Sequence, residues 1–277
     1  MTALPLPPVT RHFVDTPDAC IHIAASGSGP AVLMLHQTPR SWDEFRRALP
    51  MIGRSYRAIA MDTVGFGDST ALPFPDNSIE RWAACAFGLL DALDLPRAAL
   101  VGHHTGAAVA VEMAAQRPER IAAMVLSAPP YVDAARRRAK AGKPVVDEVS
   151  RRADGGHLSD LWSMRRPDYP PGDIELLERF MIDALKAGPM AAEGHRVVNR
   201  YRMEERLALV RCPARILAPL KDRHAAPHAR QVARAIAGAD VEEMDDAMVP
   251  FPDQQPEIFA DAVLRFLHRA YPRLGAP

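Results

Sequence analysis

The sequence predicts an α/β protein in which a mostly parallel sheet is flanked by helices. Short apolar runs alternate with amphipathic segments, which is the pattern of repeated strand–helix–strand units. The 277 residues are 48% hydrophobic and 25% charged, so the chain can bury a core as one large domain or as one domain with an insertion. A long middle segment has helical character without intervening strands, which indicates such an insertion.

The first half of the chain contains four expected strands, each an apolar run bounded by turn residues. They span residues 31–35, 56–61, 98–101 and 121–127. Between them, apolar residues recur at spacings of three and four over 78–93, which predicts a helix with Ser78 as its N-cap. Further helices are expected at 42–49 and 106–116.

From Tyr131 to Leu209 the chain is rich in arginine, proline and glycine, and its clearest helices are expected at 173–186 and 191–201. Alternation then resumes, with strands expected at 214–220 and 240–244 and helices at 229–236 and 256–270. We therefore expect a core formed by residues 1–130 and 210–277, interrupted by a helical cap subdomain at 131–209.

Charge and composition narrow the range of partners. Lysine plus arginine equals aspartate plus glutamate, 34 each, so nothing favours nucleic acid or an anionic membrane. The basic run Arg136–Arg138 with Lys140 is expected to be a solvated helix face. The N-terminus lacks a signal-peptide pattern and no window resembles a transmembrane helix. We expect a cytoplasmic protein with a small-molecule substrate; the oligomeric state, including a homodimer, is left open.

Cysteine and histidine spacing gives no metal or disulfide pattern. The three cysteines lie far apart, which fits a reducing compartment. His103 and His104 are adjacent at a turn and point in different directions, while His224 and His228 have no evident third ligand. Because a metal site needs three or four convergent ligands, no metal and no other cofactor are expected.

The segment Leu100–Ala110 carries the strongest chemical signal. It reads as a buried strand, the turn Gly102-His103-His104-Thr105-Gly106 and an alanine-rich helix. Such a turn strains its tip residue, and its glycines avoid collisions between the strand and the helix. The tip, His104, would lie beside N–H groups at the helix start, which stabilise anions.

Five features in order resemble the α/β-hydrolase superfamily over nearly the whole chain. They are the turn His36-Gln37-Thr38-Pro39, the turn Asp62–Ser69, the glycine-flanked elbow, the inserted segment, and Asp222 directly after the strand at 214–220. The resemblance implies the α/β-hydrolase fold, with an eight-stranded sheet and an inserted cap. It also implies that Asp222 is the acid of the site and that the backbone N–H groups of Thr38 and Thr105 form an oxyanion hole.

The departures from the superfamily pattern decide the predicted chemistry. His104 stands where serine, aspartate or cysteine is usual, and Val249 or Met248 stands where the triad histidine is usual. Gln37 replaces a small glycine. A serine-type triad needs a nucleophile that a neighbouring base deprotonates, and neither is present. Ordinary Ser-His-Asp ester hydrolysis is therefore not expected.

A histidine takes and releases protons near neutral pH, so His104 is predicted to act as an acid–base catalyst in a covered pocket. Asp222 is expected to orient it, across a gap left by the missing triad histidine, and His103 is the third predicted catalytic residue, shaping the pocket floor. The predicted pocket residues are His36, Gln37, Met248 and Val249. Candidates for the pocket-facing side of the cap are Trp162, Met164, Tyr169, Phe180, Met181, His195 and Tyr201.

The favoured hypothesis is thus an atypical hydrolase, lyase or isomerase that acts on a small, partly apolar organic molecule. Two alternatives stay open. The first is a non-catalytic ligand-binding homologue, which would bind without turnover. The second is a metal-dependent hydrolase, which would be sensitive to chelators.

Overall fold

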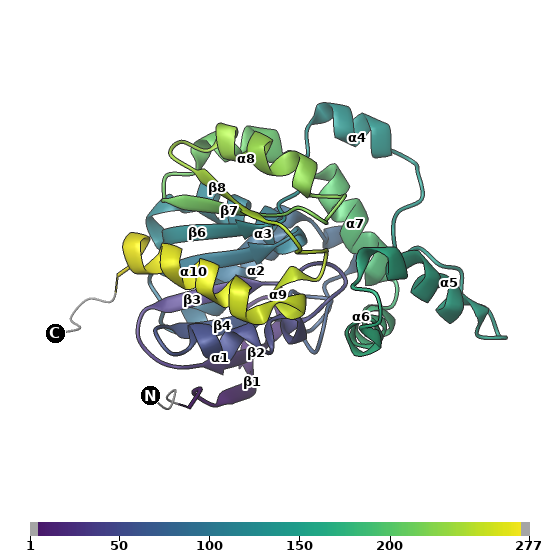
Figure 1. Cartoon of the computed structure of the whole chain (residues 1–277), viewed down its shortest axis with the longest axis horizontal. Helices are drawn as coiled ribbons and strands as arrows, with labels where there is room; N and C mark the ends of the chain where they lie inside the picture. The colour runs from purple at the N-terminus through teal and green to yellow at the C-terminus, as the bar shows by residue number, and fades with distance from the viewer. Residues whose placement is uncertain (1–4, 273–277) are drawn as a thin grey trace.

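A central eight-stranded sheet organises the protein, a computed structural model that describes residues 5–272. Its strands are β1 (Val9–Asp15), β2 (Cys20–Ser26), β3 (Ala31–Leu35), β4 (Arg57–Met61), β5 (Ala98–His103), β6 (Ile121–Ser127), β7 (Ala214–Pro219) and β8 (Asp240–Met244). They lie in the order β1-β2-β4-β3-β5-β6-β7-β8 (Figure 1). The pairs β1–β2 and β2–β4 are antiparallel and the other pairs are parallel, which confirms the predicted fold class.

Helices cover both faces of this sheet (Figure 1). On one face lie α1 (Ala48–Ile52), α9 (Phe251–Gln254) and α10 (Pro256–Ala270), and on the other lie α2 (Ile79–Ala92), α3 (Thr105–Gln116) and α8 (Ala229–Ala235). Because successive strand residues point to opposite faces, Val32 packs in one core and Leu33 in the other. Burial on both faces explains why β3 is apolar throughout.

Most of the expected elements are present, and several match residue for residue. The structure has strands at Ala31–Leu35, Ile121–Ser127 and Asp240–Met244 and a helix at Pro256–Ala270, as predicted. The helix expected over 42–49 is instead a 3₁₀ turn at Trp42–Phe45 followed by α1.

Strands β1 and β2 were not predicted from the sequence. Strand β1 lies at the edge of the sheet, and most of its side chains are exposed, so it has no apolar run to mark it. Strand β2 carries the polar His22 at a fully buried position, which breaks the apolar pattern of its neighbours.

Only helices and loops occur between β6 and β7. The helices are α4 (Ala134–Lys140), α5 (Gly156–Arg165), α6 (Ile174–Ala187) and α7 (Met190–Arg200). They lie at one end of the sheet (Figure 1), and α5 and α6 enclose a small core around Leu161 and Phe180. We call residues 131–209 the helical segment. Within residues 5–272, no helix is long and apolar enough to cross a membrane.

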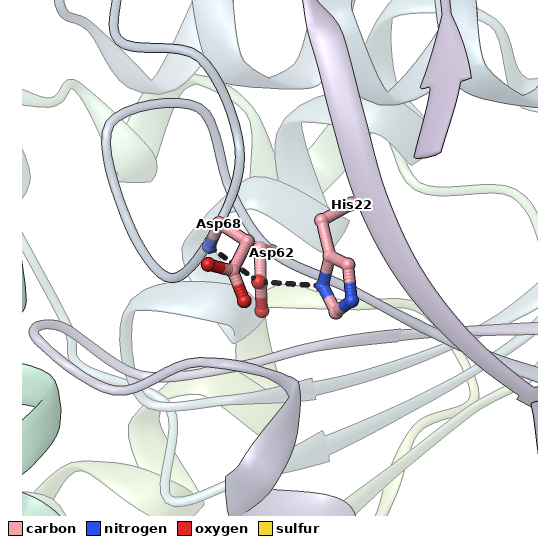
Figure 2. Close-up of side chains that lie close together, drawn as sticks. All are labelled: His22, Asp62 and Asp68. Carbon is pink, nitrogen blue, oxygen red and sulfur yellow. Dashed lines mark hydrogen bonds and ion pairs between the residues drawn. The ribbon is translucent and has the colours of Figure 1, made fainter. Parts of the chain in front are cut away.

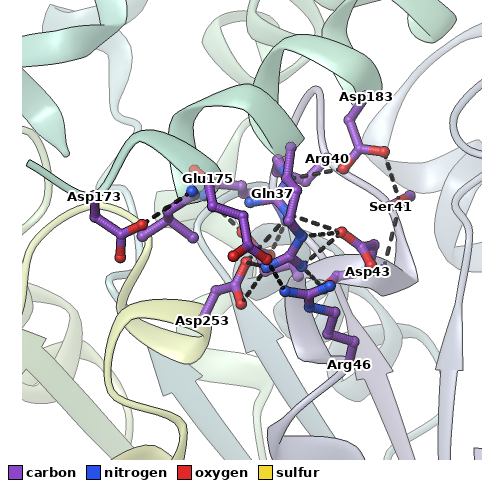
Figure 3. Close-up of polar contacts among 12 residues, drawn as sticks. Gln37, Arg40, Ser41, Asp43, Arg46, Asp173, Glu175, Asp183 and Asp253 are labelled. Carbon is purple, nitrogen blue, oxygen red and sulfur yellow. Dashed lines mark hydrogen bonds and ion pairs between the residues drawn. The ribbon is translucent and has the colours of Figure 1, made fainter. Parts of the chain in front are cut away.

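A buried charge network fixes α6 against the sheet-bearing part of the chain (Figure 3). The fully buried Arg40 donates through Nε to Asp183 of α6 at 2.7 Å, and Ser41 donates to the same carboxylate at 2.9 Å. Arg179 of α6 donates to Asp253 at 2.8 Å. Since a buried charge that loses its partner is strongly destabilising, this network holds the helical segment in place over the end of the sheet.

Candidate active site

The predicted elbow is present between β5 and α3. His104 joins them with φ 46° and ψ −110°, a conformation that a non-glycine residue adopts only under constraint. A Cβ at Gly102 would lie 2.4 Å from the carbonyl oxygen of Gly106, and one at Gly106 would lie 1.9 Å from the carbonyl oxygen of Leu35. Glycine is therefore required on both sides of the tip, and the turn fixes the direction of the His104 side chain.

The imidazole of His104 contacts Asp222 directly. Its Nε2 lies 2.7 Å from Asp222 Oδ2, so the gap expected between these residues is absent, and that expectation was wrong. The contact is an ion pair by distance but is not aligned as a hydrogen bond, and neither atom has another hydrogen-bond partner within residues 5–272. Asp222 Oδ1 accepts the backbone N–H groups of His224 and Ala225 at 2.9 and 3.1 Å.

Asp222 is ionised at neutral pH. Burial alone would raise the pKa of its carboxyl, but the neighbouring His104 and the backbone N–H of His224 lower that pKa to about 2. The carboxylate is fully buried, so its charge acts on His104 with little screening by water. The pair can therefore hold the ring in one orientation and stabilise it when it takes up a proton.

A cavity of about 170 Å³ opens in front of His104, whose side chain is 17% exposed. Gln37, Thr38, Thr105 and Val249 line it from the sheet side, and His195 and Arg165 line it from the helical segment. Within residues 5–272, the only polar partner of the His104 ring is the Asp222 carboxylate, at Nε2. Nδ1 is thus free to exchange a proton with a molecule in the cavity that His104 lines.

Two backbone donors border the same cavity. Thr38 and Thr105 both line it, and neither backbone N–H bonds to a residue in the described part of the chain. Beside them, Gln37 donates its backbone and side-chain N–H groups to Glu44 at 2.9 and 2.6 Å. The buried Glu44 therefore holds the glutamine that replaces the usual glycine. The oxyanion hole itself stays a prediction.

The structure places His103 outside the cavity, which corrects the prediction that it is catalytic. Its ring is fully buried, with Nδ1 2.9 Å from Ser127 Oγ and Nε2 2.8 Å from the carbonyl oxygen of Val249. Burial, and next the adjacent His104, hold the pKa of His103 well below its usual range. The neutral ring donates to Val249 and so ties the loop after β8 to the elbow.

Two of the four predicted pocket residues also lie elsewhere. Both ring nitrogens of His36 bond to backbone, to the carbonyl of Gln37 at 2.8 Å and the N–H of Thr63 at 2.9 Å, and the buried ring does not line the cavity. Met248 lines a separate groove. The prediction is thus corrected for His36 and Met248, while Gln37 and Val249 do line the cavity.

A second histidine–aspartate pair, which the sequence analysis missed as a pair, faces the cavity from the helical segment. His195 Nε2 lies 2.8 Å from Asp147 Oδ2, and Arg165 Nε donates to Asp147 Oδ1 at 2.6 Å. Asp147 and Arg165 are both buried. Burial lowers the pKa of His195, and Arg165 keeps the pKa of Asp147 far below its usual range although burial opposes this.

Of the candidates for the pocket-facing side of the cap, only His195 lines this cavity. Tyr169, Phe180 and Met181 instead belong to the small core of the helical segment. His195 was identifiable from its place in a predicted helix of the insertion. Asp147 and Arg165 carried no such signal, because their roles arise only from the fold.

One cluster of potential metal ligands lies elsewhere, and Figure 2 shows its three members, His22, Asp62 and Asp68. Their ligand atoms lie within 4.8 Å of one another. Asp62 Oδ2 contacts His22 Nδ1 and accepts the Asp68 N–H, both at 2.8 Å, and its Oδ1 accepts the Trp42 N–H at 2.7 Å. Arg11 binds the Asp68 carboxylate at 3.0 Å. These contacts explain the cluster as a brace for the turn after β4.

Comparison with known proteins agrees with this architecture. A family model described as alpha/beta hydrolase fold matches residues 30–167. Epoxide hydrolase 2 of Siraitia grosvenorii is 40% identical over 114 residues, which are 40% of this chain and 36% of that protein. The 2-hydroxy-6-oxo-6-phenylhexa-2,4-dienoate hydrolase of Comamonas testosteroni is 35% identical over 119 residues, 42% of each chain.

These matches span well under half the length of the curated relatives. The likeness in structure is broader: the enol-lactonase of Burkholderia xenovorans LB400 covers 92% of this chain and 99% of its own, with a TM-score of 0.76 and 20% identity. At that identity the likeness shows the fold. Together with the family match and the elbow between β5 and α3, it shows that the chain belongs to the α/β-hydrolase superfamily.

Proposed function

We propose that the chain is an enzyme that hydrolyses a small, partly apolar organic molecule, with His104 as general base. One observation carries this proposal: the His104 ring reaches the cavity while its Nε2 lies 2.7 Å from the buried Asp222 carboxylate. The relatives named above are hydrolases, of an epoxide and of a dienoate, which favours hydrolysis over lyase or isomerase chemistry.

The proposed reaction needs no protein nucleophile. His104 Nδ1 removes a proton from a water molecule, and the water oxygen forms a bond to an electrophilic carbon of the substrate. The substrate oxygen that gains negative charge is held by the N–H groups of Thr38 and Thr105. The bond to the leaving group then breaks, and the imidazolium returns its proton to that group. Asp222 stabilises the imidazolium throughout.

His195 adds a second polar group to the cavity, from the helical segment. Its pairing with Asp147 parallels the pairing of His104 with Asp222. Burial lowers the pKa of His195 and its Nε2–H is directed at the Asp147 carboxylate, so we infer that the neutral ring accepts a hydrogen bond from the substrate through Nδ1. In this proposal the helical segment acts as a cap, because it contributes His195 and separates the reacting atoms from bulk water.

The test is His104→Ala, assayed on p-nitrophenyl acetate and styrene oxide. We expect kcat/KM to fall by roughly 10²–10⁴-fold, the usual contribution of a positioned base. The matched control is His12→Ala, which removes an exposed histidine of β1. Circular dichroism checks that both variants fold.

Three results would count against the proposal. Unchanged activity in His104→Ala would refute the role of this residue. Tight ligand binding by the wild-type protein without turnover would favour the non-catalytic alternative. Turnover without incorporation of heavy oxygen from labelled water would favour a lyase or isomerase, in which the same base removes a proton from carbon.

A further inference from the structure

The cavity in front of His104 is lined by groups of one charge sign. Its lining includes the cationic Arg136, Lys140 and Arg165 and three histidines, while no aspartate or glutamate of the described chain lines it. The carboxylates that contact the lining histidines, Asp222, Asp147 and Asp168, are each engaged by a histidine or an arginine. The whole chain carries as many acidic as basic residues, so this excess of positive groups belongs to one region, which also includes the adjacent groove lined by Lys140, Lys143 and Arg196.

Arg136 and Lys140 of α4 make no ion pair within residues 5–272, whereas Arg165 is paired with Asp147. Arg136 is the more buried of the two, and its Nε has no hydrogen-bond partner within those residues. Its other nitrogens reach only neutral oxygens, the Tyr131 carbonyl at 3.3 Å and Asn199 Oδ1 at 3.5 Å. The expectation that the basic run forms a solvated face is therefore corrected. Of its three arginines only Arg138 is exposed, because Arg136 is half-buried and Arg137 pairs with Glu204.

The Asp133 carboxylate attracts the half-buried Arg136 guanidinium but forms no ion pair with it, so no anion contacts the guanidinium. This arrangement is unfavourable for the empty protein. Moving a cation out of water costs free energy unless an opposite charge replaces the lost hydration, and burial correspondingly lowers the pKa of Arg136. A planar guanidinium matches a carboxylate in shape and can donate two parallel hydrogen bonds to it. Such a ligand would supply the opposite charge and accept the N–H groups of Nη1 and Nη2 that their single bonds to Tyr131 and Asn199 leave unused.

We propose that the cavity binds an organic acid whose carboxylate is held by Arg136, with support from Lys140 on the next turn of α4. The remainder of the ligand then extends toward His104, which lines the same cavity. The identity of the acid as a substrate rests on the function proposed above. The anion site does not, because it is defined by Arg136 and the lining residues alone.

The test measures binding, so it needs no turnover. Isothermal titration at low salt compares three acids with their isosteric amides: acetate with acetamide, butyrate with butyramide, and phenylacetate with phenylacetamide. We expect at least one acid to bind about tenfold or more tightly than its amide, since one charge-assisted hydrogen bond supplies a difference of that size. Inorganic phosphate is the reference for a bare anion and should bind more weakly than that acid.

Three variants on one helix locate the site. Arg136→Gln should lose the preference for the acid, whereas Arg138→Gln makes the same charge change on the exposed side of α4 and should keep it. Arg136→Lys retains the positive charge and should keep part of the preference. The melting temperature of Arg136→Gln should match or exceed that of the wild type, because the substitution removes an unpaired cation.

Several outcomes would overturn the inference. These are equal binding of acids and amides, no binding of any acid, phosphate binding more tightly than every acid, or an unchanged preference in Arg136→Gln. His104→Ala separates this inference from the proposed function. If only the catalytic proposal is wrong, the acid preference stands while the substitution leaves turnover unchanged; if only the anion site is wrong, His104→Ala still abolishes turnover while acids and amides bind alike.

Discussion

Two of the three histidines that line the cavity, His104 and His195, are held in different ways. His104 sits on an elbow that the backbone fixes, and its partner Asp222 is held by two backbone N–H groups in the loop after β7. His195 lies on α7, and its partner Asp147 is held mainly by the side chain of Arg165. Asp147 itself has φ 67°, in the left-handed region. One pair is thus placed by the sheet and the other by ion pairs within the helical segment.

This difference suggests a division of labour. Backbone hydrogen bonds and strand ends set the His104–Asp222 geometry as soon as the sheet forms. The His195–Asp147 pair needs Arg165, whose guanidinium also stacks 4.8 Å above the centre of the Phe180 ring, and so depends on the packing of the helical segment. We therefore expect the chemistry to depend more strongly on the pair at the elbow than on the pair in the helical segment.

Of the variants that test this comparison, Asp222→Asn is expected to lower kcat the most. Asparagine has the same shape and its Oδ1 can still accept the two backbone N–H groups, but it no longer stabilises the protonated ring of His104. We expect kcat to fall roughly 10²-fold with little change in KM, as for an interaction made mainly in the transition state. Steady-state kinetics on the probe substrates checks this.

Asp246→Asn is the matched control, because Asp246 is an exposed aspartate in the loop after β8 and lies outside the cavity. A normal kcat in Asp222→Asn would show that the 2.7 Å contact does not serve catalysis. A rise in KM alone would instead assign Asp222 to ligand binding.

His195→Gln should have a smaller effect, about tenfold on kcat, because His195 contributes one hydrogen bond to the substrate and carries no charge that the reaction creates. Glutamine can still donate a hydrogen bond to Asp147, so the Arg165 ion pair should remain. His157→Gln serves as control, since His157 lies in the same helical segment but does not line the cavity. A larger loss in His195→Gln than in Asp222→Asn would reverse the proposed division of labour.

The His104–Asp222 pair was predictable from the sequence, whereas the His195–Asp147 pair was not. The elbow and Asp222 were predictable, because glycine spacing and the end of a strand are local features that the backbone converts directly into position. Asp147 pairs with residues 18 and 48 positions away, and such side-chain contacts leave no local pattern. Arg136 was mistaken for a surface residue because a seven-residue helix is too short for its periodicity to show which side is covered.

The adjacent pair His103 and His104 shows the limit of motif reasoning most directly. Both were assigned to catalysis from the same motif, yet their rings lie at 90° to each other, one in the core and one at the cavity. Motif spacing places the backbone of a turn. Which of two neighbouring side chains reaches the ligand depends on the conformation at the tip.

His103 gives the smallest expected effect, a change in the pH dependence of stability. Its pKa in the folded protein lies well below the ordinary value, because burial disfavours the charged ring and His104 adds to this. Below about pH 6.5 the unfolded chain therefore binds a proton at this position that the folded chain does not. The free energy of unfolding should then fall as the pH falls, by up to about 1.4 kcal/mol per pH unit from this one group.

His103→Gln isolates that contribution. Glutamine can still donate to the Val249 carbonyl, and it does not titrate. Urea unfolding at a series of pH values gives the free energy of unfolding of wild type and variant as a function of pH. The two plots should run parallel above about pH 7 and converge toward about pH 5, because only the wild type loses the contribution of His103. His36 and His195 also have lowered pKa values and act in both proteins, so they cancel in the difference. Plots that stay parallel throughout would mean that His103 has the same pKa in the folded and the unfolded chain. Below that pKa the Val249 loop would then be held to the elbow by a charged ring, which would add a positive charge directly behind His104.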